Sequence, residues 1–291
     1  VPCVLSTHGM LDDWSMAQSR LKKAVYTGLV ARRMFKGVRA FHTTAEDERR
    51  QAGARIDVSR ADVIPYITDL EPFHELPGPG MARERFGLDP RRPSVLYLSR
   101  LHYKKQPEVL IDAAARWRDA GEDTVLLLAG PGEDSYVASL KRRAEAAGLD
   151  EDRCRFLGMV SGELKLSLYE AADVFAMPTS QENFGLVYTE ALACRTPIVA
   201  TKGTDIWREL EATGGATIAE PTPEAFADAI SRLLSDPGTL ASMGERGRMH
   251  VFEWLDPDTL AREYEDMYAK AAGSDAPSAA PAAIAEAGAA S

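Results

Sequence analysis

From residue 93 onward, short apolar runs alternate with longer segments of helical periodicity, and this alternation constrains the fold more than any other feature. Helical patterns separate the apolar runs, which are rich in Val, Leu, Ile and Phe. The runs lie at 94–98, 124–129, 153–157, 173–177, 197–201 and 215–218. Strands of this kind predict a parallel sheet covered by helices on both faces. The sequence therefore predicts a doubly wound α/β domain with six strands.

The helices expected between these strands lie at 106–120, 133–147, 163–171, 185–195 and 204–211, and two more follow at 222–235 and 237–250. Before residue 93 the patterns are shorter. They predict strands at 1–6, 39–42 and 62–66, and helices at 15–36 and 45–52. These elements indicate a second, smaller α/β domain.

We divide the chain on this basis. The Pro- and Gly-rich stretch that begins near Glu75 interrupts any regular element and marks a boundary. A helix from Pro257 to about Ala271 is expected to cross back and brace the first domain. The predicted units are an N-terminal domain (1–76), a linker (77–92), a C-terminal domain (93–255), this helix (256–272) and a disordered Ala- and Pro-rich tail (273–291).

Composition narrows the class of protein. The chain has 291 residues, 45% of them apolar, which is enough for two cores. A formal charge of −10 argues against nucleic-acid binding. Three cysteines without metal or disulfide spacing indicate a reducing compartment. There is neither a long apolar run nor a signal-peptide pattern, so we expect a cytoplasmic protein.

One local charge pattern differs from the acidic whole. No acid occurs between Asp13 and Glu46. The basic residues in this gap are Arg20, Lys22, Lys23, Arg32, Arg33, Lys36 and Arg39. This basic helix, 20–39, is either a solvated face or a surface for an anionic lipid headgroup or lipid-linked acceptor. The second interpretation would place the protein at the inner face of the membrane.

Two carboxylates flank the start of the helix predicted at 185–195. Glu182 lies in the loop after the strand at 173–177, and Glu190 lies on the second turn of the helix. Free N–H groups and the dipole at a helix N-terminus favour a phosphate, whereas a carboxylate accepts hydrogen bonds from hydroxyls. A nucleotide-sugar site fits both properties. The alternative is that Glu182 caps the helix and Glu190 lies on a solvated face.

Other strand-end loops carry compatible residues. Arg100 and Lys105 follow the strand at 94–98 and are spaced to clamp a diphosphate, or else are simply solvated. Gly130 and Gly132 follow the next strand and allow close approach of a ligand to the backbone. Val160 follows the strand at 153–157. Ligands bind outside the carboxyl ends of such strands, so these loops are expected to form one site.

These loops carry a set of motifs in a fixed order. They are Ser-Arg-Leu (99–101), Leu-Ala-Gly-Pro-Gly (128–132), Phe-Leu-Gly-Met-Val (156–160), Ala-Asp-Val-Phe-Ala-Met-Pro-Thr (172–179) and Glu-Asn-Phe-Gly-Leu-Val-Tyr-Thr-Glu-Ala-Leu-Ala (182–193). Their order and the spacing of the two glutamates resemble the group 1 glycosyltransferases. That retaining GT-B family includes bacterial mannosyltransferases, sucrose-phosphate synthases and glycogen synthases. The resemblance covers residues 93–255 densely.

The resemblance implies a role for each motif residue. Arg100 and Lys105 would neutralise the donor diphosphate as it leaves, and Glu182 would accept hydrogen bonds from donor-sugar hydroxyls. Glu190 would bind the ribose, and Val160 would contact the base through its backbone. The remaining donor contacts would come from the glycines and the loop after Glu182: Gly130, Gly132, Asn183, Phe184, Gly185 and Leu186. No metal or other cofactor is expected in such a site.

The resemblance extends to the N-terminal part. His8 follows the first strand at the position of a family histidine that reaches the donor sugar; the alternative is a turn residue held by backbone. Asp12 and Asp13 are better explained as helix caps than as a metal pair. The family usually has further βαβ units before this strand. We therefore expect the N-terminal Rossmann-like domain to be incomplete, because the chain either was processed or begins partway through a longer gene. Such a domain would expose an unpaired strand edge and a large apolar surface unless a partner covers them.

Three departures from the family pattern stand out. Tyr66 and Ile67 occupy a position where the family usually has a Pro-Asn-Gly turn. Gln106 and Arg195 stand where glycine is common. None removes a proposed ligand contact, but each changes a loop that borders the expected site.

The resemblance predicts transfer of a hexosyl group, with retention of configuration, from a UDP-, GDP- or ADP-linked sugar. The acceptor would be a glycan, a lipid-linked saccharide or a small molecule. Two alternatives remain at this point. The chain could be the nucleotide-sugar-binding subunit of a split transferase, inactive alone, or a GT-B epimerase that binds the same donors.

Overall fold

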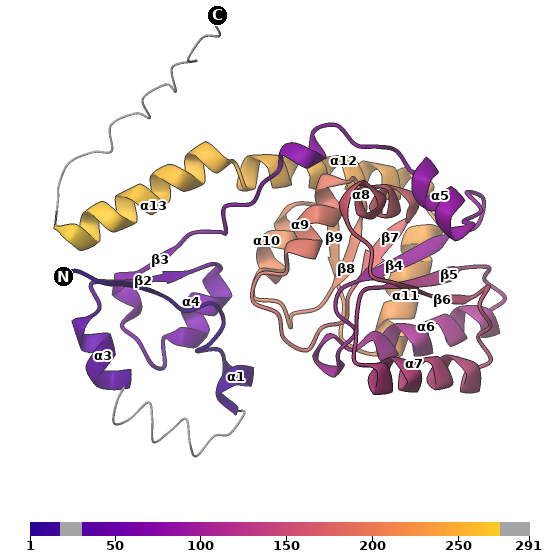
Figure 1. Cartoon of the computed structure of the whole chain (residues 1–291), viewed down its shortest axis with the longest axis horizontal. Coiled ribbons are helices and arrows are strands. Elements are labelled where there is room, and N and C mark those ends of the chain that lie inside the picture. Colours follow the sequence, from indigo (N-terminus) through magenta and orange to yellow (C-terminus); the bar gives the residue numbers. More distant parts are fainter. Residues whose placement is uncertain (18–30, 274–291) are drawn as a thin grey trace, which may run out of the picture.

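The computed structural model describes residues 1–17 and 31–273, which form two α/β domains, each built on a parallel sheet (Figure 1). The larger sheet has the order β6-β5-β4-β7-β8-β9. Its strands are β4 (Ser94–Leu98), β5 (Val125–Ala129), β6 (Cys154–Gly158), β7 (Val174–Ala176), β8 (Ile198–Ala200) and β9 (Ala216–Ile218). This is the predicted doubly wound sheet, with bounds within two residues of those expected. The order reverses between β4 and β7, which is where ligands bind in such sheets.

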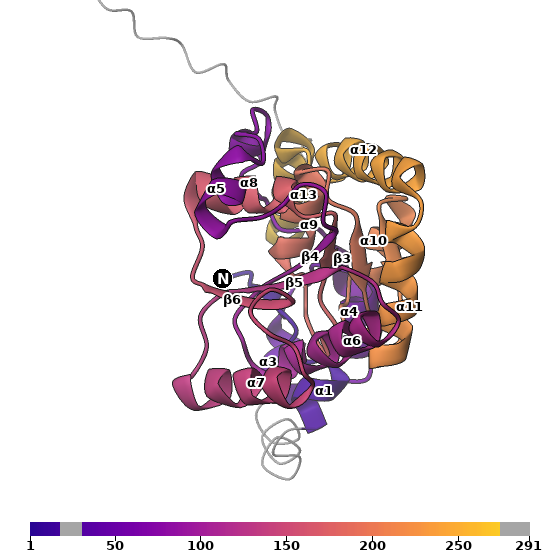
Figure 2. The same cartoon turned by 90° about the vertical axis from the view of Figure 1, so that its right-hand side faces the viewer.

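Helices cover both faces of this sheet (Figure 2). On one face lie α5 (Gly80–Phe86), α8 (Gly162–Ala171), α9 (Leu186–Ala193) and α12 (Pro237–Trp254). The other face carries α6 (Pro107–Asp119), α7 (Asp134–Ala146) and α11 (Pro223–Leu234). The short helix α10 (Trp207–Ala212) precedes β9. Every residue of β4 and β5 is buried, which explains why these strands read as unbroken apolar runs.

Large side chains fill the space between sheet and helices. Trp117 projects from α6, Phe175 comes from β7, Tyr188 from α9 and Phe226 from α11, and each is 1% exposed or less. Burying one such side chain contributes about 1.5–3 kcal/mol. The ends of the strands that carry the site are therefore held by a well-filled core.

The smaller domain has three parallel strands in the order β1-β2-β3. They are β1 (Val4–Ser6), β2 (Ala40–Thr43) and β3 (Ala61–Val63). Helices α1 (Asp13–Ala17), α3 (Arg32–Gly37) and α4 (Glu46–Ala52), with the 3-10 turn η2 (Val58–Arg60), complete it. Residues 18–30 of the predicted helix 15–36, and with them three of the seven basic residues of the basic helix, lie outside the described residues.

The chain crosses between the domains twice (Figure 1). After β3 it passes the turn η3 (Glu71–Phe73) and reaches α5, which lies within the predicted linker and docks on α8: the Ala82 N–H donates to Ser167 Oγ (2.9 Å). At the other end, α13 (Pro257–Ala272) returns to the small domain. There the Tyr264 hydroxyl donates to the Pro65 carbonyl (3.2 Å). The tail predicted to be disordered, 273–291, lies outside the described residues after Gly273.

Within the described ranges, none of the helices has both the length and the apolar character that a membrane span requires.

Candidate functional site

The loops after β4 and β7 lie side by side at the point where the strand order reverses. The main-chain N–H of Ser180 donates to the Lys104 carbonyl (3.0 Å), and its hydroxyl donates to the same oxygen (2.9 Å). Thr179 Oγ1 adds a third bond to that carbonyl (3.2 Å). The predicted diphosphate-binding loop and the predicted sugar-binding loop are thus joined directly.

Lys105 and Glu182 form an ion pair at this junction. The lysine side chain is 11% exposed and the glutamate side chain 22%, so both charges are largely removed from water. Burial, with the nearby charges of Lys104 and Arg100, lowers the pKa of Lys105 to about 8, whereas its pairing with Glu182 favours the charged ammonium. Arg100 itself is exposed. The sequence predicted these residues at one site but not that two of them would pair.

Backbone geometry explains the position of Glu182. Its N–H donates to the Gly203 carbonyl (2.7 Å), and its own carbonyl accepts from Asp205 (2.9 Å). Gly185 then turns the chain into α9 with φ +68°. A Cβ there would lie 2.8 Å from Tyr188 and 2.9 Å from Glu182, so glycine is needed for the close approach.

Glu190 has a partner that the sequence did not reveal. Lys165 of α8 donates to one carboxylate oxygen (2.8 Å), and the Tyr169 hydroxyl donates to the other (3.0 Å). Lys165 and Tyr169 are four residues apart and share a helix face. That spacing is readable in the sequence, but the meeting of α8 with α9 is not. Glu190 is thereby held partly buried, with 18% of its side chain exposed.

The other predicted donor contacts occupy the same edge. Gly130 adopts φ +130°, and a Cβ there would lie 2.0 Å from the Ser99 carbonyl oxygen, so this glycine allows the loops after β4 and β5 to touch. Gly132 is similarly close to Leu101. Val160 is half-buried after β6. Within the β7 loop, Asn183 is half-buried, Phe184 is fully buried, and Leu186 is exposed.

His8 lies on an exposed turn after β1 with φ +45°, a conformation that is costly for a residue with a Cβ. Glu48 holds this turn. Its carboxylate accepts from the Thr7 hydroxyl and the Gly9 N–H (both 2.6 Å) and, at its other oxygen, from the Thr44 N–H (2.7 Å). Glu48 is 1% exposed, and these hydrogen bonds lower its pKa against the opposing effect of burial. Sequence patterns gave no sign of this role.

Asn183 connects the two domains. Its side-chain oxygen accepts from the hydroxyl of Tyr66 (3.1 Å) and lies 3.2 Å from the hydroxyl of Thr44, both in the small domain. Its amide nitrogen donates to Asp205 (3.2 Å). Asp205 in turn accepts from Gln51 of α4 (2.8 Å). Polar side chains therefore link the loop that follows β7 to the small domain, which carries His8.

Further contacts extend this interface. Gln181 donates to Asp12 of the small domain (2.5 Å), and Asp12 also accepts from Ser15. The second interaction agrees with the capping role predicted for Asp12. Asp47 of α4 accepts from Trp207 and Arg208 at the start of α10. Burial, followed by the carboxylates of Glu48 and Asp12, raises the pKa of Asp205 to about 7.

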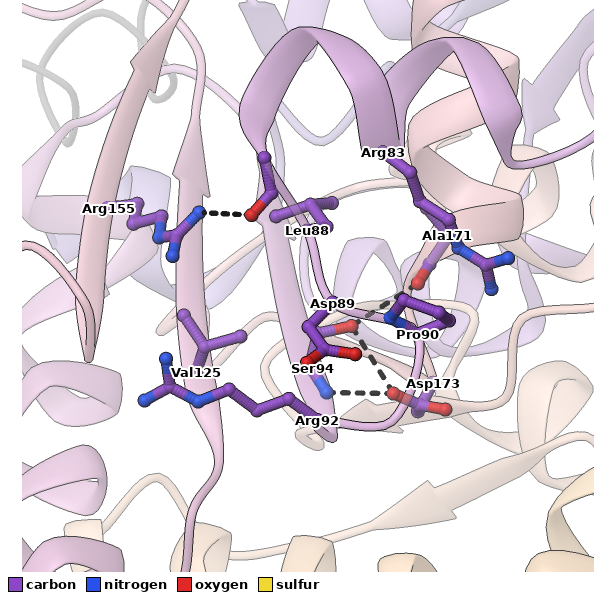
Figure 3. A pocket seen from close by; sticks show the side chains of 11 residues that line it. Arg83, Leu88, Asp89, Pro90, Arg92, Ser94, Val125, Arg155, Ala171 and Asp173 are labelled. Carbon is purple, nitrogen blue, oxygen red and sulfur yellow. Dashed lines mark hydrogen bonds between the residues drawn. The ribbon is translucent and has the colours of Figure 1, made fainter.

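A small cavity of about 50 Å³ lies at the opposite ends of the strands (Figure 3). Three of its charged groups have partners in the chain. Arg155 donates to the Gly87 carbonyl (3.1 Å), and Asp173 accepts from the Ser94 N–H (2.7 Å). Arg92 pairs with Asp123 (3.0 Å). These contacts stabilise the bottom of the sheet. Across residues 1–17 and 31–273, no cluster of three or more His, Cys, Asp or Glu side chains is arranged to hold a metal ion.

Comparison with known proteins now places the chain. Residues 81–250 match the family model described as glycosyl transferases group 1. The chain is 35% identical, over 212 residues, to a D-inositol 3-phosphate glycosyltransferase of Salinispora arenicola, an alignment that covers 68% of this chain and 47% of that protein. A protein of the same name from Xylanimonas cellulosilytica is 34% identical over 236 residues, which cover 78% of this chain and 55% of the relative. The chain thus spans about half the length of the curated relatives that it matches.

Solved structures agree on the architecture. Anabaena HepE, crystallised with UDP and glucose, superposes with a TM-score of 0.78 at 21% identity and covers 92% of this chain and 71% of its own. The sucrose-phosphate synthase of Thermosynechococcus elongatus gives a TM-score of 0.72 at 25% identity, with 84% of this chain and 61% of that chain covered. The predicted GT-B arrangement of two Rossmann-like domains is confirmed.

Proposed function

The chain belongs to the group 1 glycosyl transferases, and we propose that it transfers a hexosyl group from a nucleotide-diphosphate sugar to an acceptor with retention of configuration. The donor lies at the carboxyl ends of β4, β5, β6 and β7. Its diphosphate contacts Arg100 and Lys105, its sugar contacts Glu182, and its ribose contacts Glu190. The small domain contributes His8 from the opposite side.

The junction of Lys105 with Glu182 carries this proposal. A cation and a carboxylate that are both largely buried, at the point where the strand order reverses, form a site for a ligand with an anionic part and a hydroxyl-bearing part. When the glycosidic bond breaks, negative charge develops on the diphosphate, and a fixed ammonium stabilises that charge more than the ground state. Glu182 then orients the sugar.

UDP is the first donor nucleotide to test, because the Anabaena neighbour is crystallised with UDP. D-inositol 3-phosphate is the first acceptor, because curated relatives carry that name. The family assignment favours a transferase over the epimerase and the inactive subunit, and the described contacts give neither alternative separate support.

Isothermal titration of the purified chain with UDP, GDP and ADP tests the donor site. We expect one nucleotide to bind, and Arg100→Ala and Glu190→Ala each to weaken that binding by about tenfold or more, since ~1.4 kcal/mol is a factor of ten and charge-assisted hydrogen bonds contribute ~1.5–3 kcal/mol. Lys141→Met on α7 is the control for Arg100→Ala. It also removes one positive charge, but from a side chain that packs on Phe156 and is not a proposed donor contact. Absence of binding by all three nucleotides would reject the donor site.

Product analysis tests the reaction. The chain is incubated with the sugar form of the nucleotide that binds, with and without acceptor, and the anomeric configuration of the product is read by NMR. Transfer with retained configuration supports the proposal. An inverted product rejects the retaining mechanism, and conversion of the donor sugar in the absence of acceptor would instead support the epimerase.

A further inference from the structure

Three side chains from separate loops meet where the small domain contacts the loop that follows β7. They are His8 after β1, Tyr66 after β3 and Asn183 after β7. His8 Nδ1 lies 2.7 Å from the Tyr66 hydroxyl oxygen, and the Tyr66 hydroxyl donates to Asn183 Oδ1 across 3.1 Å. Tyr66 is one of the residues that depart from the family pattern, so a link of this kind is a property of this chain.

Asp205 sets the direction of these hydrogen bonds. Above its pKa of about 7, Asp205 is an ionised carboxylate and only accepts, so the NH₂ group of Asn183 must face Asp205, which lies 3.2 Å away. The Asn183 oxygen then faces the hydroxyls of Thr44 and Tyr66. The single hydrogen of the Thr44 hydroxyl goes to the Glu48 carboxylate (2.9 Å), so Tyr66 is the hydroxyl that donates to Asn183. The reverse orientation of the amide would place its oxygen against the carboxylate, where the two negative groups repel.

The direction of these hydrogen bonds decides which nitrogen of His8 carries the proton. A phenol has one hydrogen to donate, and Tyr66 gives it to Asn183. Its oxygen can therefore only accept from His8, so the imidazole carries its proton on Nδ1. In a neutral imidazole the other nitrogen, Nε2, then has a free lone pair. Within the described residues Nε2 of His8 has no hydrogen-bond partner, and the side chain is exposed.

Ring packing holds the same three residues in place. The rings of His8 and Tyr66 stack with centroids 5.5 Å apart and an interplanar angle of 14°. The Tyr66 ring meets the buried Phe184 at 72°, with centroids 5.2 Å apart. Phe184 follows Asn183 in the chain. Packing against Phe184 therefore fixes the Tyr66 ring, and the Tyr66 hydroxyl then determines which nitrogen of His8 carries the proton.

We propose that Tyr66 is a positioning residue that holds His8 in the Nδ1–H tautomer, so that Nε2 accepts a hydrogen bond from a hydroxyl of the donor sugar. The inference rests on the proposed function, because it takes the sugar to lie against His8. It adds a specificity element: a donor sugar gains this contact only if it carries a hydroxyl at that place.

Nitrogen NMR of the full chain tests the tautomer directly. Histidines are labelled with ¹⁵N, spectra are recorded near about pH 8, where neutral imidazoles dominate, and the His8 signals are assigned by their loss in His8→Gln. We expect a protonated Nδ1 and an unprotonated Nε2 for His8. His42 is an internal reference, because its Nε2 lies 2.8 Å from the Ile64 carbonyl, an acceptor, and must carry the proton.

Tyr66→Phe removes the hydroxyl and keeps the ring. The variant should shift His8 toward the Nε2–H tautomer and lower kcat/KM by about five- to tenfold, the range for loss of one neutral hydrogen bond. Affinity for the free nucleotide should stay within about twofold, because the sugar is absent from that ligand. Tyr136→Phe is the matched control for the tautomer: it deletes a hydroxyl that donates to Glu108 (2.7 Å) and should leave the tautomer of His8 unchanged.

The outcomes separate this inference from the function on which it rests. An Nε2–H tautomer in the unmodified chain, or one that is unchanged in Tyr66→Phe, overturns the positioning role even if the protein is fully active. The predicted tautomer with an unchanged kcat/KM in Tyr66→Phe overturns the contact with sugar. If nucleotide titration and turnover both fail while the tautomer is as expected, the proposed function is wrong and the sugar contact is wrong with it.

Discussion

Lys105 and Glu182, which are expected to contact the diphosphate and the sugar of a donor, are paired with each other. The pair satisfies two largely buried charges that would otherwise be costly to keep. A bound donor would offer each of them a new partner, a diphosphate oxygen for the lysine and a sugar hydroxyl for the glutamate. The pair thus holds these two side chains of the site in one arrangement.

Variants that remove this pair should affect stability and kcat differently. In Lys105→Gln the uncompensated Glu182 lowers stability, whereas the double variant with Glu182→Gln leaves two neutral side chains and should recover most of it. Both variants should lose about 10²-fold or more in kcat, because the developing charge on the diphosphate is no longer neutralised. Initial rates and thermal melts measure the two effects. A double variant with normal kcat would contradict the role of Lys105.

The contact of Lys165 with Glu190 predicts coupling in nucleotide binding. Lys165→Met should weaken UDP affinity in the same direction as Glu190→Ala, because the carboxylate loses the group that holds it. The effects should not add: the double variant should bind about as weakly as the weaker single variant. Titration calorimetry on all four proteins gives the coupling energy. Fully additive losses would show that Lys165 acts independently of Glu190.

Arg195 offers a test of backbone strain. It ends the turn after α9 with φ +63°, a left-handed conformation that costs a residue with a Cβ about 1–2 kcal/mol. Its ion pair with Glu245 is exposed and adds little. Arg195→Gly should therefore raise the free energy of unfolding by a net ~0.5–1 kcal/mol, after the larger entropy of an unfolded glycine is subtracted. The thermal midpoint should rise with it. Arg195→Ala removes the ion pair but keeps the strain, so a rise of equal size in that variant would refute the explanation.

Asp205 should make stability fall as pH rises. Its pKa is raised from 3.8 to about 7 by burial and by neighbouring carboxylates, so between these values the folded state holds a proton that the unfolded state has released. The free energy of unfolding contributed by this group is therefore highest at the acidic end of the window and decreases toward neutral pH. Thermal melts of the chain and of Asp205→Asn across that range measure the effect. The variant should show a flatter profile; an identical slope would assign the dependence to other groups.

The strands of the large sheet were predictable because parallel strands buried on both faces leave unbroken apolar runs, as β4 and β5 do. The position of Glu182 and Lys105 at one edge also followed, since the carboxyl ends of parallel strands share an edge. Contacts between separate elements did not follow. Lys165 reaches Glu190 only because α8 packs beside α9, and periodicity does not encode which helices are neighbours.

The link from Tyr66 to Asn183 was also outside the reach of sequence patterns. It joins two loops more than a hundred residues apart, and it depends on how the domains are placed. Tyr66 was visible only as a departure from a family turn. The glycines of the 130–132 loop show a related effect: their small size predicted close approach of a ligand, and the structure shows that Gly130 lies against the loop that follows β4.

The two crossings between the domains limit how they can move. The segment after β3 leads out of the small domain, and α13 leads back, where Tyr264 bonds to the Pro65 carbonyl beside that first segment. A body attached at two points turns about the line through them and does not slide freely. Separation of the two domains would therefore be a rotation, and a single cut near Leu255, just before α13, would leave the domains joined by only one segment.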